Sequence, residues 1–152
     1  MYLTVCRTDP QYPRLAEIWK SSRSDAQWSK ATAVQITADT LSIYAHPAVS
    51  PDGHYLYFTS DMPGGYGGLD LWRVPMDDHG LGAVENLGPD INTAGNEVFP
   101  TFRPSGELYF SSNGRGGMGG LDIFRAREDT VSHAGTLRPC RLRSTRMPMT
   151  SA

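Results

Sequence analysis

The chain has 152 residues, which is the length of one ordinary domain. It carries 14 basic and 16 acidic residues, and this balance excludes the strongly basic character of a general nucleic-acid binder. Apolar residues make up 39% of the chain, enough for a core, and two cysteines are too few for a disulfide-dense scaffold.

Short runs rich in Tyr, Phe, Leu, Val and Thr recur along the chain between clusters of Pro, Gly, Asp and Asn, which is the pattern of β-strands. No segment combines a helical period with capping residues. We therefore expect an all-β fold. The ten strands are predicted near residues 1–5, 16–20, 28–36, 42–49, 54–60, 69–74, 83–87, 97–102, 107–112 and 121–126.

An internal repeat organises these strands. PDGHYLYFTSDMPGGYGGLDLWRV at residues 51–74 aligns with PSGELYFSSNGRGGMGGLDIFRA at residues 104–126, with one residue deleted from the later copy. A weaker copy without the glycine cluster opens the chain at residues 2–20. A four-stranded unit of this length fits a β-propeller blade. We expect a partial propeller of about two and a half blades, at residues 1–36, 42–87 and 97–126.

Each of the two later copies contains a turn and a glycine-rich loop. The turn residues are Pro51, Asp52, Gly53, Pro104 and Gly106, which suit type I turns because proline presets φ at the second position. The loops GGYGG and GGMGG join two strands through conformations that residues with a Cβ avoid. We expect Asp70 and Asp122, which follow these loops, to accept backbone N–H bonds and to order the glycines.

The repeat resembles a known family. SPDGHYLYFTSDMPGGYGGLDLW is similar to the Pro-Asp-Gly repeat of TolB-like, WD-repeat-like β-propellers. The longer pattern, in which ENLGPDINTAGNEVFPTF follows GGYGGLD, resembles propellers of bacterial outer-membrane-associated proteins. In such proteins the propeller accompanies an OmpA-like peptidoglycan-binding domain, and some of them belong to the type IX secretion apparatus.

The resemblance covers residues 1–128 and implies a non-catalytic scaffold or binding module. It implies a periplasmic or outer-membrane-associated location, no cofactor, and a protein or a cell-envelope glycan such as peptidoglycan as partner. No nucleic acid is expected as a partner. The sequence shows neither a signal peptide after Met1 nor an apolar stretch of the roughly 20 residues that a membrane span needs.

The pattern stops near residue 128. Residues 129–152 form a basic tail with four arginines and no repeat signal, and we expect it to be irregular. The tail is either genuine or a truncated gene fragment read in a shifted frame. A propeller closes with about 4–8 blades, so we expect the isolated chain to self-associate through its uncovered faces and strand edges.

Loop tips on a rigid scaffold are the first candidates for ligand binding. These candidates are Asp61, Tyr66, Asn113, Arg115 and Met118. The periodic aromatic residues Trp19, Trp72 and Phe124 are expected in the core between blades.

The sequence favours a protein that is not an enzyme and holds no metal. A glycosidase needs paired carboxylates, and the spacing of Asp61, Glu97 and Asp122 pairs none of them. The histidines are scattered, and GGxGGxD differs by one position from the calcium-binding GGxGxD pattern. Two alternatives stay open. One is part of a hydrolase, a glycosidase or a peptidase, whose catalytic residues lie elsewhere, and the other is a calcium-stabilised adhesive module.

Overall fold

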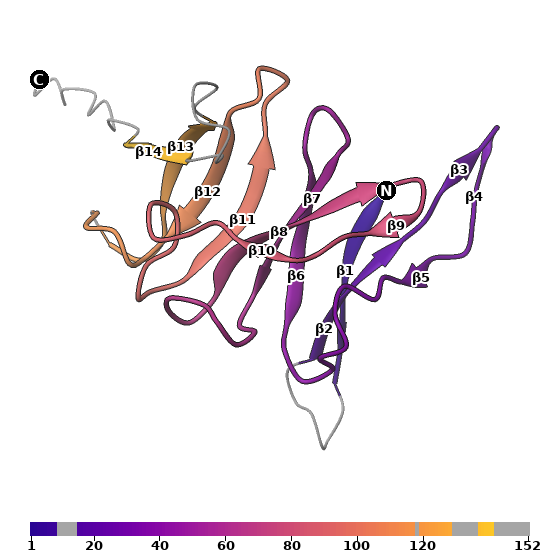
Figure 1. Ribbon diagram of the computed structural model, residues 1–152, viewed down its shortest axis with the longest axis horizontal. Coiled ribbons are helices and arrows are strands. Elements are labelled where there is room, and N and C mark those ends of the chain that lie inside the picture. Colours follow the sequence, from indigo (N-terminus) through magenta and orange to yellow (C-terminus); the bar gives the residue numbers. More distant parts are fainter. Residues whose placement is uncertain (9–14, 118, 129–136, 142–152) are drawn as a thin grey trace, which may run out of the picture.

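The computed structural model describes residues 1–8, 15–117, 119–128 and 137–141. Within these ranges every regular element is a β-strand, and the strands form three antiparallel sheets and one separate hairpin (Figure 1). The all-β prediction is therefore confirmed for the part of the chain that the structure describes. We find no helix there that has the length and apolar character to cross a membrane.

The first sheet has the strand order β1-β2-β5. Its strands are β1 (Tyr2–Arg7), β2 (Leu15–Lys20) and β5 (Thr32–Ala33). Between β2 and β5 a two-stranded hairpin projects away from the body of the molecule (Figure 1). The hairpin consists of β3 (Arg23–Ser24) and β4 (Gln27–Trp28).

The single strand predicted over residues 28–36 is wrong. Trp28 belongs to the hairpin, and the strand that pairs with β2 consists of residues 32–33. The chain reverses at Asp25, whose φ of 53° is left-handed. Aspartate tolerates this conformation because its short polar side chain bonds locally, but no glycine marks the turn in the sequence.

The second sheet has the path β10-β8-β7-β6, with β9 pairing the far end of β8. Its strands are β6 (Tyr44–Val49), β7 (Tyr55–Ser60), β8 (Asp70–Asp77), β9 (Gly80–Leu81) and β10 (Glu85–Asn86). The third sheet has the order β11-β12-β13-β14. Its strands are β11 (Glu97–Phe102), β12 (Leu108–Ser112), β13 (Asp122–Glu128) and β14 (Leu137–Arg141).

The tail that we expect to be irregular from residue 129 contains β14, so the prediction is wrong for residues 137–141. This segment pairs antiparallel with β13, with Cys140 opposite Arg125. Its sequence has no apolar alternation. The pairing follows instead from the unpaired N–H and C=O groups along the edge of β13, which any backbone can satisfy. Residues 129–136 and 142–152 lie outside the described residues.

The pairing of β2 with β5 in the first sheet repeats the pairing of β8 with β10 in the second sheet, displaced by 53 residues. Trp19 pairs with Ala33 in the first sheet as Trp72 pairs with Asn86 in the second. The N–H of Val34 donates to the carbonyl of Ile18, 2.8 Å away, and residues 87 and 71 repeat this bond. The opening copy, although its sequence is degenerate, therefore folds as the same unit as the later ones.

Apolar side chains fill the two junctions between sheets. The junction of the first and second sheets holds Ile18, Tyr44, Leu56, Phe58, Trp72 and Val74. The junction of the second and third sheets holds Tyr57, Leu71, Ile91, Leu108, Phe110 and Phe124. Successive residues of β7 face opposite junctions because side chains alternate along a strand. The core positions predicted for Trp72 and Phe124 are confirmed, whereas Trp19 is half-buried.

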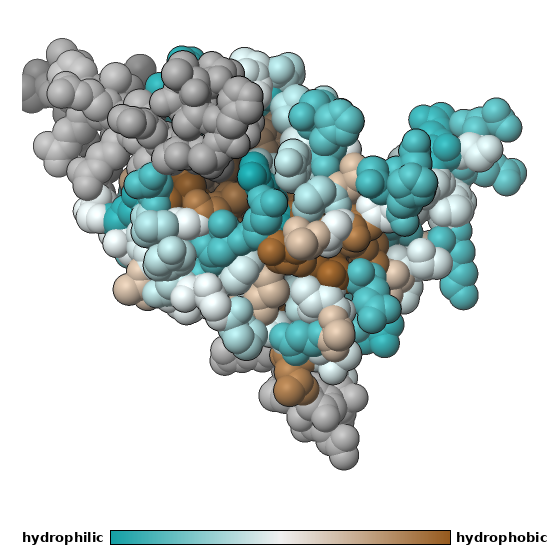
Figure 2. All heavy atoms as spheres, viewed as in Figure 1, coloured by the Kyte–Doolittle hydropathy of each residue, from teal (hydrophilic) through white to brown (hydrophobic). Residues whose placement is uncertain are grey.

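The surface differs between the sheets and the hairpin. Figure 2 shows that the projecting hairpin β3–β4 is almost wholly hydrophilic on this face, while hydrophobic surface lies over the sheets. Large exposed apolar side chains include Leu121 and Ile123, at 51% and 59% exposure. Leu121 directly precedes β13, and Ile123 lies within it, in the third sheet.

Candidate functional site

The glycine-rich loops pack against the segment that links the second sheet to the third. We call residues 61–69, 88–96 and 113–117 together the glycine rim. The N–H of Gly68 donates to the carbonyl of Gly95, 2.8 Å away, and the N–H of Leu69 donates to Oδ1 of Asn96 at 3.0 Å. A Cβ on Gly67 would lie 2.3 Å from the carbonyl oxygen of Thr93. Only glycine allows this approach, so the loop is built for packing against the linker.

The third sheet extends the same contact. A Cβ on Gly114 would lie 1.8 Å from Oγ1 of Thr93, and a Cβ on Gly95 would lie 2.6 Å from Cα of Gly114. Three segments that are remote in sequence therefore meet through glycines. The sequence pattern does not predict the linker residues as part of this rim, although the run Asn-Thr-Ala-Gly-Asn contains the polar and small residues that such contacts need.

Asp70 orders the first glycine loop from within. Its side chain is 1% exposed, and Oδ2 accepts the N–H of Tyr66 and the side-chain N–H of Asn86. Burial raises the pKa of Asp70 above its usual range, although both bonds oppose the shift. A Cβ on Gly65 would lie 2.3 Å from Oδ2. The carboxylate therefore occupies the space that glycine leaves.

Asp122 takes the corresponding place in the third sheet. A Cβ on Gly117 would lie 1.5 Å from its Oδ2, as Gly65 faces Asp70 in the second sheet. The two aspartates thus stand in the same relation to their glycines. The backbone N–H bond that the sequence predicts is seen for Asp70, from Tyr66.

Glu97 is a second buried carboxylate of the rim, with no exposed surface. It accepts bonds from the backbone N–H of Thr93 at 2.8 Å, the hydroxyl of Thr93 at 2.7 Å and the hydroxyl of Ser112. These three donors satisfy the carboxylate inside the protein. Glu97 therefore holds the linker against β12 and offers no free oxygen to a substrate.

Asp61 and Asn113 tie strands together rather than standing free. Oδ1 of Asp61 accepts the N–H of Ile43 at 2.7 Å, and Oδ1 of Asn113 accepts the N–H of Asn96 at the same distance. The two bonds are equivalent in the two sheets. Each bond joins the residue after the second strand of its sheet, β7 or β12, to the residue just before the first strand, β6 or β11. Both side chains stay partly accessible at the surface.

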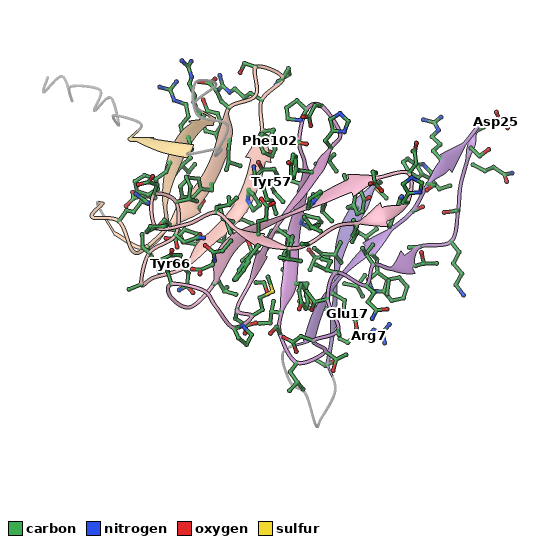
Figure 3. All side chains as sticks on the ribbon, in the orientation of Figure 1. Arg7, Glu17, Asp25, Tyr57, Tyr66 and Phe102 are labelled. Atoms are coloured by element: carbon green, nitrogen blue, oxygen red, sulfur yellow. The ribbon has the colours of Figure 1, made fainter. Side chains whose placement is uncertain are left out.

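The other three loop-tip candidates differ from one another. Tyr66 is 50% exposed on its loop (Figure 3). Arg115 turns back instead: its guanidinium donates to the carbonyl of Asp90 and lies 5.9 Å from the ring centroid of Phe124. Burial lowers the pKa of Arg115. Met118 lies outside the described residues.

The turns predicted at the start of each later copy are present. The N–H of Gly53 donates to the carbonyl of Ser50 at 2.9 Å, and the N–H of Gly106 donates to the carbonyl of Arg103 at 3.0 Å. The two glycines have φ of 80° and 86°. Pro51 and Pro104 stand at the second turn positions, and Oδ1 of Asp52 accepts the N–H of His54 at 3.0 Å.

The described residues include no group of three or more His, Cys, Asp or Glu side chains placed to hold a metal ion. Oδ2 of Asp70 and both carboxylate oxygens of Glu97 accept hydrogen bonds from within the protein. The arrangement can hold loops rigidly and display Tyr66 beside them.

No protein-family model and no curated protein matches the chain. Among solved structures, the crystal structure of TolB from Acinetobacter baumannii aligns with a TM-score of 0.47 and 19% sequence identity. The alignment covers 84% of this chain and 27% of that chain, so the chain spans about a quarter of that structure's length.

Proposed function

We propose that this chain is a segment of a β-propeller that serves as a non-catalytic interaction module of the bacterial cell envelope. The observation that carries the propeller is a repeated register: the pairs between β2 and β5 of the first sheet recur 53 positions later as the pairs between β8 and β10 of the second sheet. The first strands of neighbouring sheets also lie side by side, because β1 contacts β6 and β6 contacts β11. Radially stacked, four-stranded antiparallel sheets are the construction of a propeller.

The outer face of the third sheet supports the same proposal. Ile123 is 59% exposed, whereas Leu71, at the equivalent position of the second sheet, is fully buried against the next linker. An apolar residue that faces solvent on the last sheet and is buried on the preceding one marks the place of a following blade.

We propose that the module is not catalytic because its buried carboxylates are hydrogen-bonded within the protein. Asp70 and Glu97 are the buried acids of the rim, and both accept bonds from backbone or side-chain donors of the loops that they order. A general acid or a nucleophile needs an oxygen within reach of a substrate. These residues hold the scaffold instead.

The glycine rim is the proposed binding edge, and its partner is a protein. Tyr66 supplies a half-exposed ring on a loop that hydrogen bonds hold rigid, and such an anchor binds at little cost in conformational entropy. The assignment to the periplasm or outer membrane rests on the resemblance of the repeat to propellers of envelope proteins.

The proposal is tested by placing a photo-reactive phenylalanine analogue at position 66 of the full chain and irradiating it with solubilised envelope proteins. The matched control carries the analogue at Asp78, which is exposed in the turn between β8 and β9. We expect one protein to be cross-linked from position 66 and not from position 78. The cross-linked peptide identifies the partner.

Two results would overturn parts of the proposal. If the chain instead sediments with purified peptidoglycan sacculi, and Tyr66→Ala abolishes this, the partner is a glycan. If the chain hydrolyses glycosides or peptides, and Glu97→Gln or Asp70→Asn abolishes the activity in a folded protein, the module is an enzyme.

A further inference from the structure

A pocket of about 290 Å³ lies at the junction of the first and second sheets, outside the glycine rim. Its apolar lining comes from Ile18, Val34 and Ile36, and Ile18 is 1% exposed. The polar residues of the lining include Glu17, Thr37, Asp39, Thr40, Ser42 and Tyr44. A small apolar floor with convergent polar groups is the usual construction of a ligand site.

The next junction of the molecule shows why this pocket is open. At equivalent positions 53 residues later, Asn86 stands for Ala33 and Asp70 for Glu17. The amide of Asn86 donates to Asp70 at 3.2 Å and accepts from Asn92 at 2.8 Å. Ala33 carries no group that reaches Glu17, so the space that a hydrogen-bonded network fills at the second junction stays empty at the first.

A second difference concerns Asp39, which stands where the second junction has Asn92. The side-chain amide of Asn92 binds the backbone of Leu71 at two points. It accepts the N–H of Leu71 at 2.8 Å and donates to the carbonyl of the same residue at 2.9 Å. A carboxylate cannot donate to a carbonyl. Asp39 instead accepts from its own turn, the N–H of Leu41 at 2.8 Å and the hydroxyl of Ser42.

The lining is negative. These hydrogen bonds, led by that of Ser42, hold the pKa of Asp39 below its usual range, so that the side chain is ionised at neutral pH. Glu17 forms an ion pair with Arg7, whose Nε lies 3.5 Å from its Oε2, and Figure 3 shows the two residues together. No basic side chain lines the pocket, and Asp39 has no ion pair among the described residues.

We infer that this pocket binds a primary ammonium group carried on a short aliphatic chain. The ammonium donates to the carboxylate of Asp39 and to neighbouring hydroxyl oxygens, and the methylene groups lie against Ile18 and Val34. Charge-assisted hydrogen bonds of this kind are stronger than neutral ones. The group belongs either to a free amine or to a lysine side chain of a partner protein. This inference is independent of the function proposed for the glycine rim.

The test titrates the full chain, labelled with ¹⁵N, and follows amide shifts of Val34, Asp39 and Ser42 by NMR. The first probe is 1,5-diaminopentane, with 1,5-pentanediol as its neutral control. The second probe is a tripeptide with blocked ends and a central lysine, with norleucine in place of lysine as its control. The two amine probes distinguish a free ligand from a protein side chain.

Three variants accompany the wild type. Asp39→Asn removes the charge, and Ala33→Asn installs the residue that fills the second junction. The matched control is Asp25→Asn, because Asp25 is an exposed carboxylate at the tip of the hairpin, away from the pocket (Figure 3). Thermal unfolding of each variant shows whether it is folded.

We expect the amines and not their neutral controls to bind, and we expect Asp39→Asn and Ala33→Asn each to weaken binding by about tenfold or more. Asp25→Asn leaves the affinity unchanged. Tighter binding of the diamine indicates a free ligand, and tighter binding of the tripeptide indicates a lysine of a partner. The inference is overturned if pentanediol binds as well as the diamine, if no probe shifts these amides, or if folded Asp39→Asn binds as the wild type does.

Discussion

The imidazole of His46 lies against the phenyl ring of Phe99, with ring centroids 4.1 Å apart and the ring planes tilted by 36°. The two residues occupy equivalent positions in β6 and β11, at a bulge in each strand. Their φ angles are 51° and 57°, in the left-handed region that costs a residue with a side chain roughly 1–2 kcal/mol. A proline follows each of them. The first strands of the second and third sheets therefore meet through two residues whose backbones are in the left-handed region.

The burial of His46 gives the protein a pH dependence. Burial lowers the pKa of His46 below its usual value of 6.5. The unfolded chain then binds the proton more tightly, so the contribution of His46 to stability is present above pH 6.5 and is lost as the pH falls through the lowered pKa. We expect the melting temperature to fall between pH 7.5 and 5.5, and His46→Gln to flatten this slope. An unchanged slope in a folded variant contradicts the assignment. His54, which is exposed, supplies the control as His54→Gln.

The glycine loop gives a prediction about close packing. Gly67→Ala places a Cβ 2.3 Å from the backbone carbonyl of Thr93, which cannot move like a side-chain end. We expect a loss of about 1–3 kcal/mol in the free energy of unfolding, measured with urea. Gly120→Ala is the matched control, since its Cβ meets nothing within 4 Å. Equal stability of the two variants would show that the loop does not dock on the linker.

Glu97 gives a prediction about buried polar bonds. In Glu97→Gln an NH₂ group replaces one carboxylate oxygen. This group donates instead of accepting, and it faces the hydrogen-bond donors of Thr93 or Ser112. We expect the free energy of unfolding to fall by about 1–3 kcal/mol, the cost of a buried polar group left without its partner. Glu85→Gln tests the same change on an exposed ion pair with Arg73 and should cost less than about 1 kcal/mol. A reversed order would mean that Glu97 does not hold the linker.

Two equivalent apolar residues test what covers the third sheet. Leu71→Ala removes a fully buried side chain and should cost about 2–5 kcal/mol. Ile123 is 59% exposed, so Ile123→Ala should change the stability by less than about 0.5 kcal/mol in a monomer. A concentration-dependent loss in Ile123→Ala, seen by analytical ultracentrifugation together with thermal unfolding, would show that another copy of the chain covers this face.

Local sequence patterns determined most of the backbone. Alternating apolar residues with Pro and Gly at the turns located β6, β7, β8, β11, β12 and β13 close to their observed bounds. The turn at Gly53 follows from the residues of the turn itself. The pattern did not predict β14, because edge pairing satisfies backbone groups and needs no alternation of side chains.

The candidate site could be predicted only in part. The sequence pointed to the glycine loops and to Tyr66, but it gave Arg115 the same role. In the structure Arg115 folds back toward Asp90 and Phe124. The guanidinium meets these partners because the linker passes beside the loop, and no spacing within either segment records that approach.

The sequence by itself determined the repeating unit, its turns and the residues that alternate between its faces, since these depend on neighbours along the chain. Only the tertiary structure decided which carboxylates accept hydrogen bonds within the glycine rim and which border an open pocket. Asp70 and Glu17 hold equivalent positions, but Asp70 accepts a hydrogen bond from Asn86, whereas Ala33, at the position equivalent to Asn86, offers no such group to Glu17. The difference lies in the volume and hydrogen-bonding groups of side chains that only folding brings together.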